Sequence, residues 1–274
     1  MLPNFLCIGA QRAGTTWLYD LLASHPEVYV PARRKEVHFF DWYYNRGLSW
    51  YTRFFPSERE ANRYWAVGEV TPDYLYDPGC PKRISEILPS VKLIVILRNP
   101  VDRAYSHYGL LLRDGEITGS FEELARSDSY VIERGYYSRY LSRYLNHFER
   151  EQILVLIFER ALRDIENVKQ RLSSYLNIQP SLFPSAVGKE RINRGYLPRA
   201  HRAYTLAKRT ATKLREWDMD WAVNLAKRVG MARLFGSRGP LPPISHELRA
   251  YLTELYRHDI QKLESLLETS ISDW

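Results

Sequence analysis

The chain has 274 residues, of which 45% are hydrophobic and 26% charged, a composition typical of a folded globular protein. It contains no apolar run of the roughly 18 residues that span a bilayer, and its start, MLPNFLCIGA, lacks the basic region of a signal peptide, so we expect a cytoplasmic protein. Two cysteines exclude a disulfide framework, and a formal net charge of +7 favours an anionic partner.

The first predicted elements are a strand at residues 5–8, a loop bounded by Gly9 and Gly14, and an amphipathic helix at Thr15–Ala23. The first backbone N–H groups of a helix lack intrahelical partners and lie at the positive end of its dipole. This strand, loop and helix therefore predict a binding site for a phosphate or sulfate group. The glycine spacing matches the nucleotide-binding loop G-x-x-x-x-G-K-[ST], but Thr15 occupies the lysine position and Arg12 is the only strong cation.

Further along the chain, short apolar runs alternate with helical patterns. The predicted strands are residues 66–70, 93–97 and 153–157, and the predicted helices are residues 81–88, 100–113, 137–148 and 246–267. This alternation predicts an α/β fold: one domain over residues 1–274 with a central parallel sheet flanked by helices. Residues 200–243 predict a helical segment that packs on the sheet, serves as a substrate-side lid or makes a peripheral membrane contact.

Three motifs occur in order along this pattern. QRAGTTWL, residues 11–18, resembles the loop that binds the 5′-phosphosulfate in sulfotransferases that use 3′-phosphoadenylyl sulfate (PAPS). Arg98 and Ser106 resemble the pair that holds the 3′-phosphate, and KEVHFFD, residues 35–41, resembles the segment that carries the catalytic base. The chain thus resembles PAPS-dependent sulfotransferases, especially the heparan sulfate and carbohydrate group, in a bacterial-type, soluble form.

The resemblance implies transfer of a sulfuryl group from PAPS to a hydroxyl, and less readily to an amine, of a carbohydrate or glycolipid, with PAP as product and no metal. Glu36 is the implied base, and Arg12 stabilises the departing phosphate. If residues 36–41 are extended, Glu36 and His38 share one face and both meet the acceptor, while Asp41 lies on the other face. His38 is equally compatible with a structural role, and Asp41 reaches the acceptor only if the strand ends before it.

The implied cofactor contacts fall into three groups. Those at the 5′ end are Arg12, Ala13, Gly14, Thr15, Thr16 and Trp17, those at the 3′-phosphate are Arg98 and Ser106, and those in a closing loop are Arg191 and Arg194, with Arg238 as an alternative. Trp17 is also compatible with core packing. In GEVTPDY, Val70 replaces a lysine of the heparan group, so either Arg33, Arg34 or Lys35 supplies that cation or the acceptor is less anionic.

Two other functions are compatible with parts of the sequence. One is a P-loop kinase that uses ATP and magnesium, against which stand Thr15 in the lysine position and Arg98, rather than an aspartate, after the strand at 93–97. The other is a non-enzymatic polyanion-binding protein, suggested by the basic charge. The 20 tyrosines are scattered, so we expect no nucleic-acid partner, and no oligomeric state is predicted.

Overall fold

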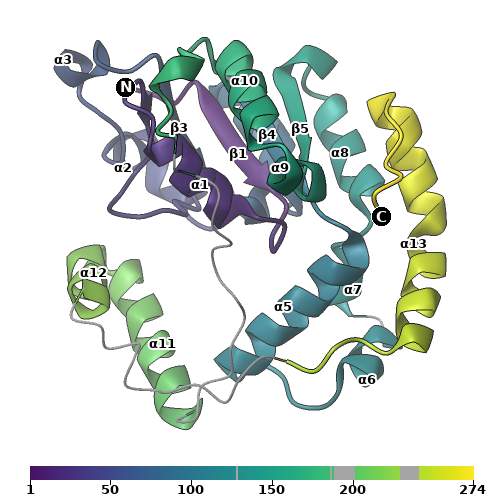
Figure 1. The fold of residues 1–274 in the computed structure, drawn as a ribbon. Helices are drawn as coiled ribbons and strands as arrows, with labels where there is room; N and C mark the ends of the chain where they lie inside the picture. Colours follow the sequence, from purple (N-terminus) through teal and green to yellow (C-terminus); the bar gives the residue numbers. More distant parts are fainter. Residues whose placement is uncertain (128, 186, 188–200, 229–240) are drawn as a thin grey trace. The chain divides into compact units, whose positions relative to one another are not determined.

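The computed structural model describes residues 1–274 except 128, 186, 188–200 and 229–240 (Figure 1). Its described part confirms the α/β fold. The sheet has five parallel strands in the order β2–β3–β1–β4–β5. In chain order the strands are β1 (Phe5–Gly9), β2 (Val28–Tyr29), β3 (Ala66–Val70), β4 (Lys92–Leu97) and β5 (Ile153–Ile157). Four of them match the sequence prediction within one residue, and the unpredicted β2 is too short to carry a periodic pattern.

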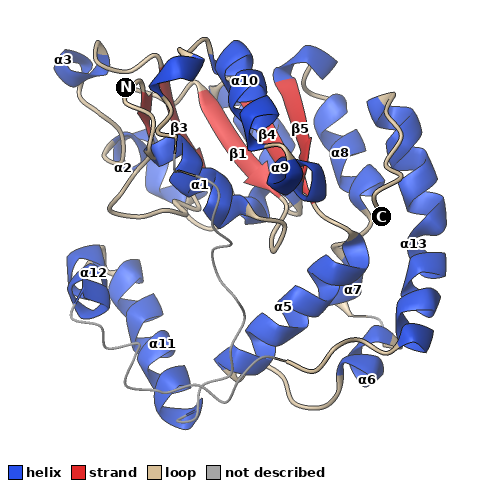
Figure 2. Ribbon diagram, viewed as in Figure 1, coloured by secondary structure: helices blue, strands red, loops and turns tan. Residues whose placement is uncertain are grey.

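The helices confirm the predicted alternation (Figure 2). Those described are α1 (Thr15–Ala23), α2 (Gly47–Thr52), α3 (Glu58–Ala61), α4 (Cys80–Ile87), α5 (Pro100–Asp114), α6 (Phe121–Ala125), α7 (Tyr130–Glu133), α8 (Tyr137–Leu145), α9 (Phe158–Arg163), α10 (Ile165–Leu176), α11 (His201–Glu216), α12 (Asp220–Arg228) and α13 (His246–Leu267). Both α1 and α13 have the bounds expected from the sequence. Over the described residues, no helix combines the length and the apolar character needed to cross a membrane.

The chain divides into two compact units. The first comprises Met1–Pro100, Tyr136–Ile192 and Tyr256–Trp274, and the second comprises Val101–Gly135 and Asn193–Leu255. The sheet belongs wholly to the first unit. The predicted helical segment at 200–243 is present as α11 and α12 in the second unit, and its role as a lid stays a prediction.

In the first unit the sheet has an apolar cluster on each face, because side chains along a strand alternate. In β1, Phe5 and Cys7 face the cluster formed with α1 and α10, whereas Leu6 and Ile8 face the cluster formed with α2, α4 and α8. Figure 1 shows α1 and α10 over the same face of the sheet. This layering leaves the carboxyl ends of the strands, and the loops that follow them, to form a site.

The C-terminal residues hold α9, the helix that follows β5. Asp273 pairs with Arg160 and Arg163, and the indole of Trp274 donates a hydrogen bond of 3.0 Å to Glu159. Glu159 also accepts a 3.0 Å bond from the backbone N–H of Asn99, which follows β4. The terminal Asp-Trp pair therefore fixes the start of α9 against the end of β4.

Candidate active site

The loop after β1 has the backbone expected of an anion site. Gly14 precedes α1 with φ of 102°, a left-handed conformation that favours glycine, and no described side chain caps the helix there. A Cβ atom on Gly14 would also lie 2.4 Å from the Phe158 ring. Glycine is thus required on two grounds, and the start of α1 is open to an anionic ligand.

Arg98 lies beside this loop, as the sequence predicts. Its Nη1 donates to the carbonyl oxygen of Arg12 over 3.4 Å, and its guanidinium carbon lies 5.5 Å from the centre of the Phe158 ring. The carbonyl of Arg98 accepts a 2.8 Å bond from the hydroxyl of Tyr137. The first unit therefore brings the two predicted anion-binding arginines, Arg12 and Arg98, to one loop.

Other predicted cofactor residues have different positions. The indole of Trp17 is buried in the core, where it makes an edge contact with Phe158, so a side-chain contact with the nucleotide is not supported and the alternative of core packing is confirmed. Ser106 lies on α5 in the second unit, and its pairing with Arg98 stays a prediction. Arg191, Arg194 and Arg238 lie outside the described residues.

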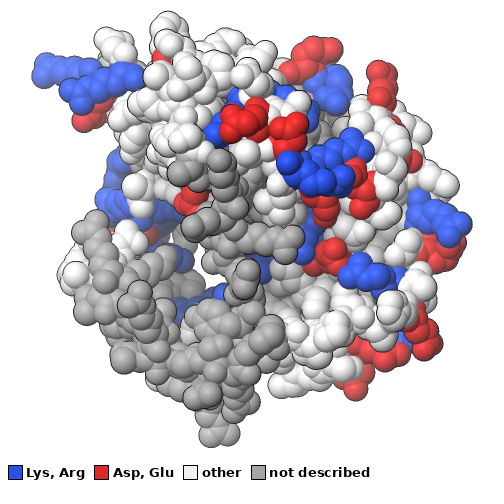
Figure 3. All heavy atoms as spheres, in the orientation of Figure 1, with Lys and Arg blue, Asp and Glu red and all other residues white. Residues whose placement is uncertain are grey.

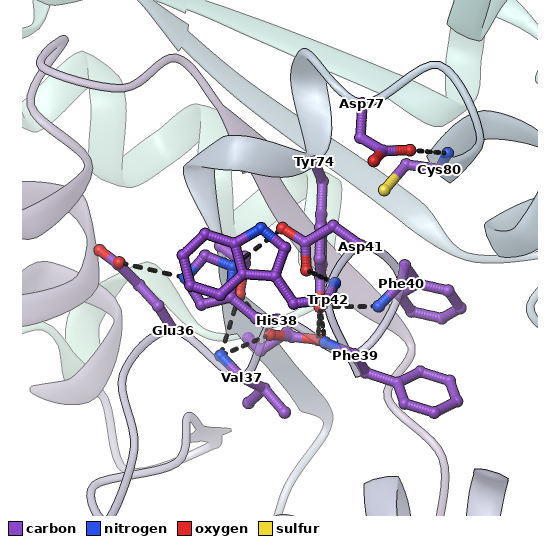
Figure 4. Close-up of polar contacts among 12 residues, drawn as sticks. Glu36, Val37, His38, Phe39, Phe40, Asp41, Trp42, Tyr74, Asp77 and Cys80 are labelled. Carbon is purple, nitrogen blue, oxygen red and sulfur yellow. Dashed lines mark hydrogen bonds and ion pairs between the residues drawn. The ribbon is translucent and has the colours of Figure 1, made fainter. Parts of the chain in front are cut away.

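The segment at residues 35–41 is fixed by a buried carboxylate (Figure 4). Glu69 in β3 has no exposed surface and accepts hydrogen bonds from the hydroxyls of Tyr51, Thr71 and Tyr74, at 2.7, 2.6 and 3.0 Å. The backbone N–H of Val37 donates to Glu69 over 3.3 Å and to the Thr71 hydroxyl over 3.1 Å. Glu69 therefore connects β3 to the backbone directly after Glu36.

Tyr74 extends this anchor past His38. Its hydroxyl accepts a hydrogen bond from the backbone N–H of Phe39 at 2.8 Å while donating to Glu69. The rings of Phe39 and Phe40 pack in the apolar cluster formed with α2, α4 and α8. The backbone on both sides of His38 is thus held by hydrogen bonds that start at one carboxylate.

Glu36, His38 and Asp41 come together, although not through the expected extended strand. His38 has φ of 57°, which turns the chain so that Asp41 lies on the same side as His38 rather than on the opposite face. Nδ1 of His38 is 2.8 Å from Asp41 Oδ2, and Nε2 is 3.7 Å from Glu36 Oε2. Trp42 stacks on the imidazole at 3.8 Å between ring centres.

The two carboxylates hold His38 in its charged form. Burial alone would lower the pKa of His38, but the hydrogen bonds and charges of Asp41 and Glu36 outweigh it and raise the pKa to about 9. His38 is therefore an imidazolium at neutral pH and cannot accept a proton there. Glu36, with 41% of its side chain exposed, remains the accessible carboxylate.

Lys35 connects this segment to the loop after β1. Its Nζ donates to Thr16 Oγ1 over 2.7 Å and lies 3.6 Å from Glu36 Oε1. Because Thr16 is in the first turn of α1, the lysine joins the predicted donor site to the predicted base. The sequence named Lys35 only as an alternative cation and did not identify Glu69, although a glutamate inside the apolar run AVGEV is a signal of a buried polar anchor.

Comparisons with known proteins agree with these motifs. A family model described as "Sulfotransferase domain" matches residues 2–194. The mouse protein named heparan sulfate glucosamine 3-O-sulfotransferase 3A1 is 34% identical over 187 residues, covering 65% of this chain and 46% of its own length. The human protein named heparan sulfate glucosamine 3-O-sulfotransferase 3B1 is 33% identical over 187 residues, covering 65% and 47%. The chain thus spans less than half the length of these two relatives.

A crystal structure covers the whole chain. A sulfotransferase from Alicyclobacillus acidocaldarius aligns with a TM-score of 0.73 and 27% sequence identity, covering 100% of this chain and 99% of that one. The match extends beyond residue 194, where the family model ends. It therefore includes the helices α11, α12 and α13 as well as the sheet.

We predict that Glu69→Gln destabilises the protein more than Tyr51→Phe. The amide nitrogen of the introduced glutamine cannot accept the hydrogen bonds that one carboxylate oxygen accepts, so buried hydroxyl or N–H donors would lose their acceptor. Tyr51→Phe removes only one of the donors. Urea unfolding should give a loss of about 2–3 kcal/mol for Glu69→Gln and about 1 kcal/mol for Tyr51→Phe. Equal losses would contradict the role of Glu69 as the central acceptor.

We predict that His38 titrates near pH 9 in the folded protein. Since this pKa lies above the ordinary value of 6.5, the stability that the imidazolium contributes is complete below about pH 6.5 and is lost as the pH rises through about 9. NMR titration of the imidazole resonances of His38 measures this pKa. Asp41→Asn should lower the pKa, and an unchanged value would refute the contribution of Asp41.

Proposed function

The chain belongs to the sulfotransferase domain family, and on that premise we propose that it transfers a sulfuryl group from PAPS to a hydroxyl of a carbohydrate acceptor. The observation that carries the proposal is the contact between the two halves of the site: Lys35 bridges Thr16, beside the anion-binding loop, and Glu36, the proposed base. Donor and acceptor chemistry therefore meet at one end of the sheet.

The residues present fit the donor PAPS. The uncapped start of α1 offers backbone N–H groups to the 5′-phosphosulfate, and Arg12 and Arg98 flank the same loop. When bound, PAPS supplies the sulfuryl group: its bond from sulfur to the phosphate oxygen breaks, PAP leaves with that electron pair, and the acceptor oxygen bonds to sulfur. Arg12 stays protonated and stabilises the negative charge of the product phosphate.

Glu36 takes the acceptor proton in this proposal. Its carboxylate is accessible, and His38 at 3.7 Å holds one of its oxygens. Since His38 is charged at neutral pH, it acts as an orienting cation, and Asp41 fixes its ring through Nδ1. The three residues thus have separate roles: Glu36 as base, His38 as the group that positions it, and Asp41 as the support of His38.

An exposed aromatic ring supports a carbohydrate acceptor. Trp42 is 65% exposed and stacks on His38, so one flat apolar face lies next to the proposed base. Such a face can pack on a sugar ring. Trp50 and Tyr51, on α2, are buried in the core and do not offer that surface. The names of the relatives, heparan sulfate glucosamine 3-O-sulfotransferases, point to the same acceptor class.

The two other candidate functions have less support. A kinase site needs an acidic residue for magnesium beside the loop, and Arg98 takes that place at the end of β4. A polyanion-binding protein needs a continuous basic surface. On the face drawn in Figure 3, Lys and Arg side chains alternate with Asp and Glu around α9 and α10.

We predict that PAP binds without magnesium and that Arg98→Ala weakens this binding about 10- to 100-fold, the loss expected for a charge-assisted fork. Adenosine 5′-monophosphate, which lacks the 3′-phosphate, should lose much less. Calorimetric titration measures both ligands, and Arg126→Ala, an exposed arginine paired with Glu122, is the matched control. An equal loss for both ligands would reject the 3′-phosphate contact, and ATP binding that requires magnesium would favour the kinase.

We predict that Glu36→Gln lowers the turnover of sulfated product by a factor of about 10² to 10⁴ while the affinity for PAP is retained, because the amide cannot take a proton. Mass spectrometry of a panel of glycan acceptors incubated with PAPS measures the product. Glu86→Gln, an exposed glutamate on α4, should leave turnover intact. Retained turnover in Glu36→Gln would assign the base elsewhere.

A further inference from the structure

We propose that Lys35 is the cation that contacts the transferred sulfuryl group. It would take the place of the lysine that the heparan group has at the position of Val70. This inference rests on the proposed function and assigns a catalytic contact within that site. It identifies one of the three neighbouring basic residues, Arg33, Arg34 and Lys35, and gives it a role distinct from that of Arg12.

The position of Lys35 between donor and base carries the inference. Its Nζ lies 2.7 Å from Thr16 Oγ1 and 3.6 Å from Glu36 Oε1, and its side chain is only 26% exposed. An ammonium has three N–H donors. Across the residues that the structure describes, these two oxygens are its polar contacts, which leaves a donor for a ligand between them. A group that moves from the start of α1 to an acceptor beside Glu36 passes this ammonium.

The neighbouring arginines do not occupy this position. Arg34 is buried, with its guanidinium carbon 5.3–5.8 Å from the ring centres of Tyr43, Trp50 and Phe54. The guanidinium of Arg34 therefore makes cation–π contacts with these three rings. Arg33 is exposed to solvent. Lys35, in contrast, contacts Thr16 on the donor side and Glu36 on the acceptor side of the site.

Lys35 also lies on the face of the sheet where a cation at position 70 would act. Val70 is buried and pairs in register with Cys7 of β1, and both side chains belong to the cluster under α1. Burial raises the pKa of the Cys7 thiol to about 12, and the charge of Lys35 acts in the opposite direction. The ammonium is bonded to Thr16 and lies 5.8 Å from the ring centre of Tyr19, and both residues belong to α1, the helix that covers this face.

A contact with the sulfuryl group predicts a specific binding difference. PAPS carries the group and PAP does not, so Lys35→Gln should weaken PAPS binding about 10-fold and leave PAP binding nearly unchanged. Calorimetry without acceptor measures both affinities. Lys35→Arg should retain part of the PAPS affinity because it keeps the charge, and Arg33→Gln, which makes the same charge change two residues away, should alter neither.

Protection from labelling gives a second readout that does not depend on turnover. Reductive methylation followed by mass spectrometry should modify Lys35 in the ligand-free protein and in the PAP complex, and PAPS should protect it. An unchanged ratio of PAPS to PAP affinity in Lys35→Gln, or an equal loss for both ligands, would overturn the inference while leaving the proposed function in place. A wild-type protein that binds neither nucleotide would reject both.

Discussion

The candidate site depends on one buried carboxylate, Glu69, whose contacts among the described residues are hydrogen-bond donors rather than cations. A carboxyl group in the core is tolerated only if hydrogen bonds replace those that it made with water. Burial raises the pKa of Glu69, and the hydrogen bonds from the Thr71, Tyr51 and Tyr74 hydroxyls act in the opposite direction. Three hydroxyls and one backbone N–H satisfy it. Because two of these donors also accept bonds from residues 37 and 39, satisfying Glu69 fixes the path of the chain between Glu36 and Phe40.

Parallel strand order explains why this anchor positions an anion site. β1 and β3 are neighbours, and the loop after β1 and the turn after β3 leave the same edge of the sheet. The backbone N–H of Thr71 donates to the carbonyl of Cys7 over 3.0 Å, so the two exits are joined at the last pair of residues. A segment bonded to Glu69 and Thr71 must then pass the start of α1, which is where Lys35 meets Thr16.

The sequence predicts the helices and strands whose hydrophobic residues repeat at a regular spacing. It does not predict contacts that depend on the backbone conformation of a single residue. Strands and helices of the first unit match because alternation and helical spacing reflect burial, which the sheet imposes. The prediction that Asp41 lies on the face opposite His38 in an extended segment is wrong. His38 itself has φ of 57°, and this turn brings Asp41 to the side of His38. Spacing alone gives no sign of that turn, because only a few per cent of residues other than glycine adopt a positive φ. Trp17 had two compatible roles, and the proximity of Phe158, far along the chain, decides for the core.

The charges around Glu36 define how the site can work at neutral pH. A histidine between two carboxylates cannot be the base, because each neighbouring negative charge favours its protonated form. Glu36, by contrast, lies between the imidazolium of His38 and the ammonium of Lys35. His38 lies at one oxygen of Glu36 and Lys35 at the other. Two cations from the same short segment therefore flank the proposed base: His38, which Asp41 supports, and Lys35, which is bonded to Thr16 in the first turn of α1, the helix that follows the predicted anion-binding loop.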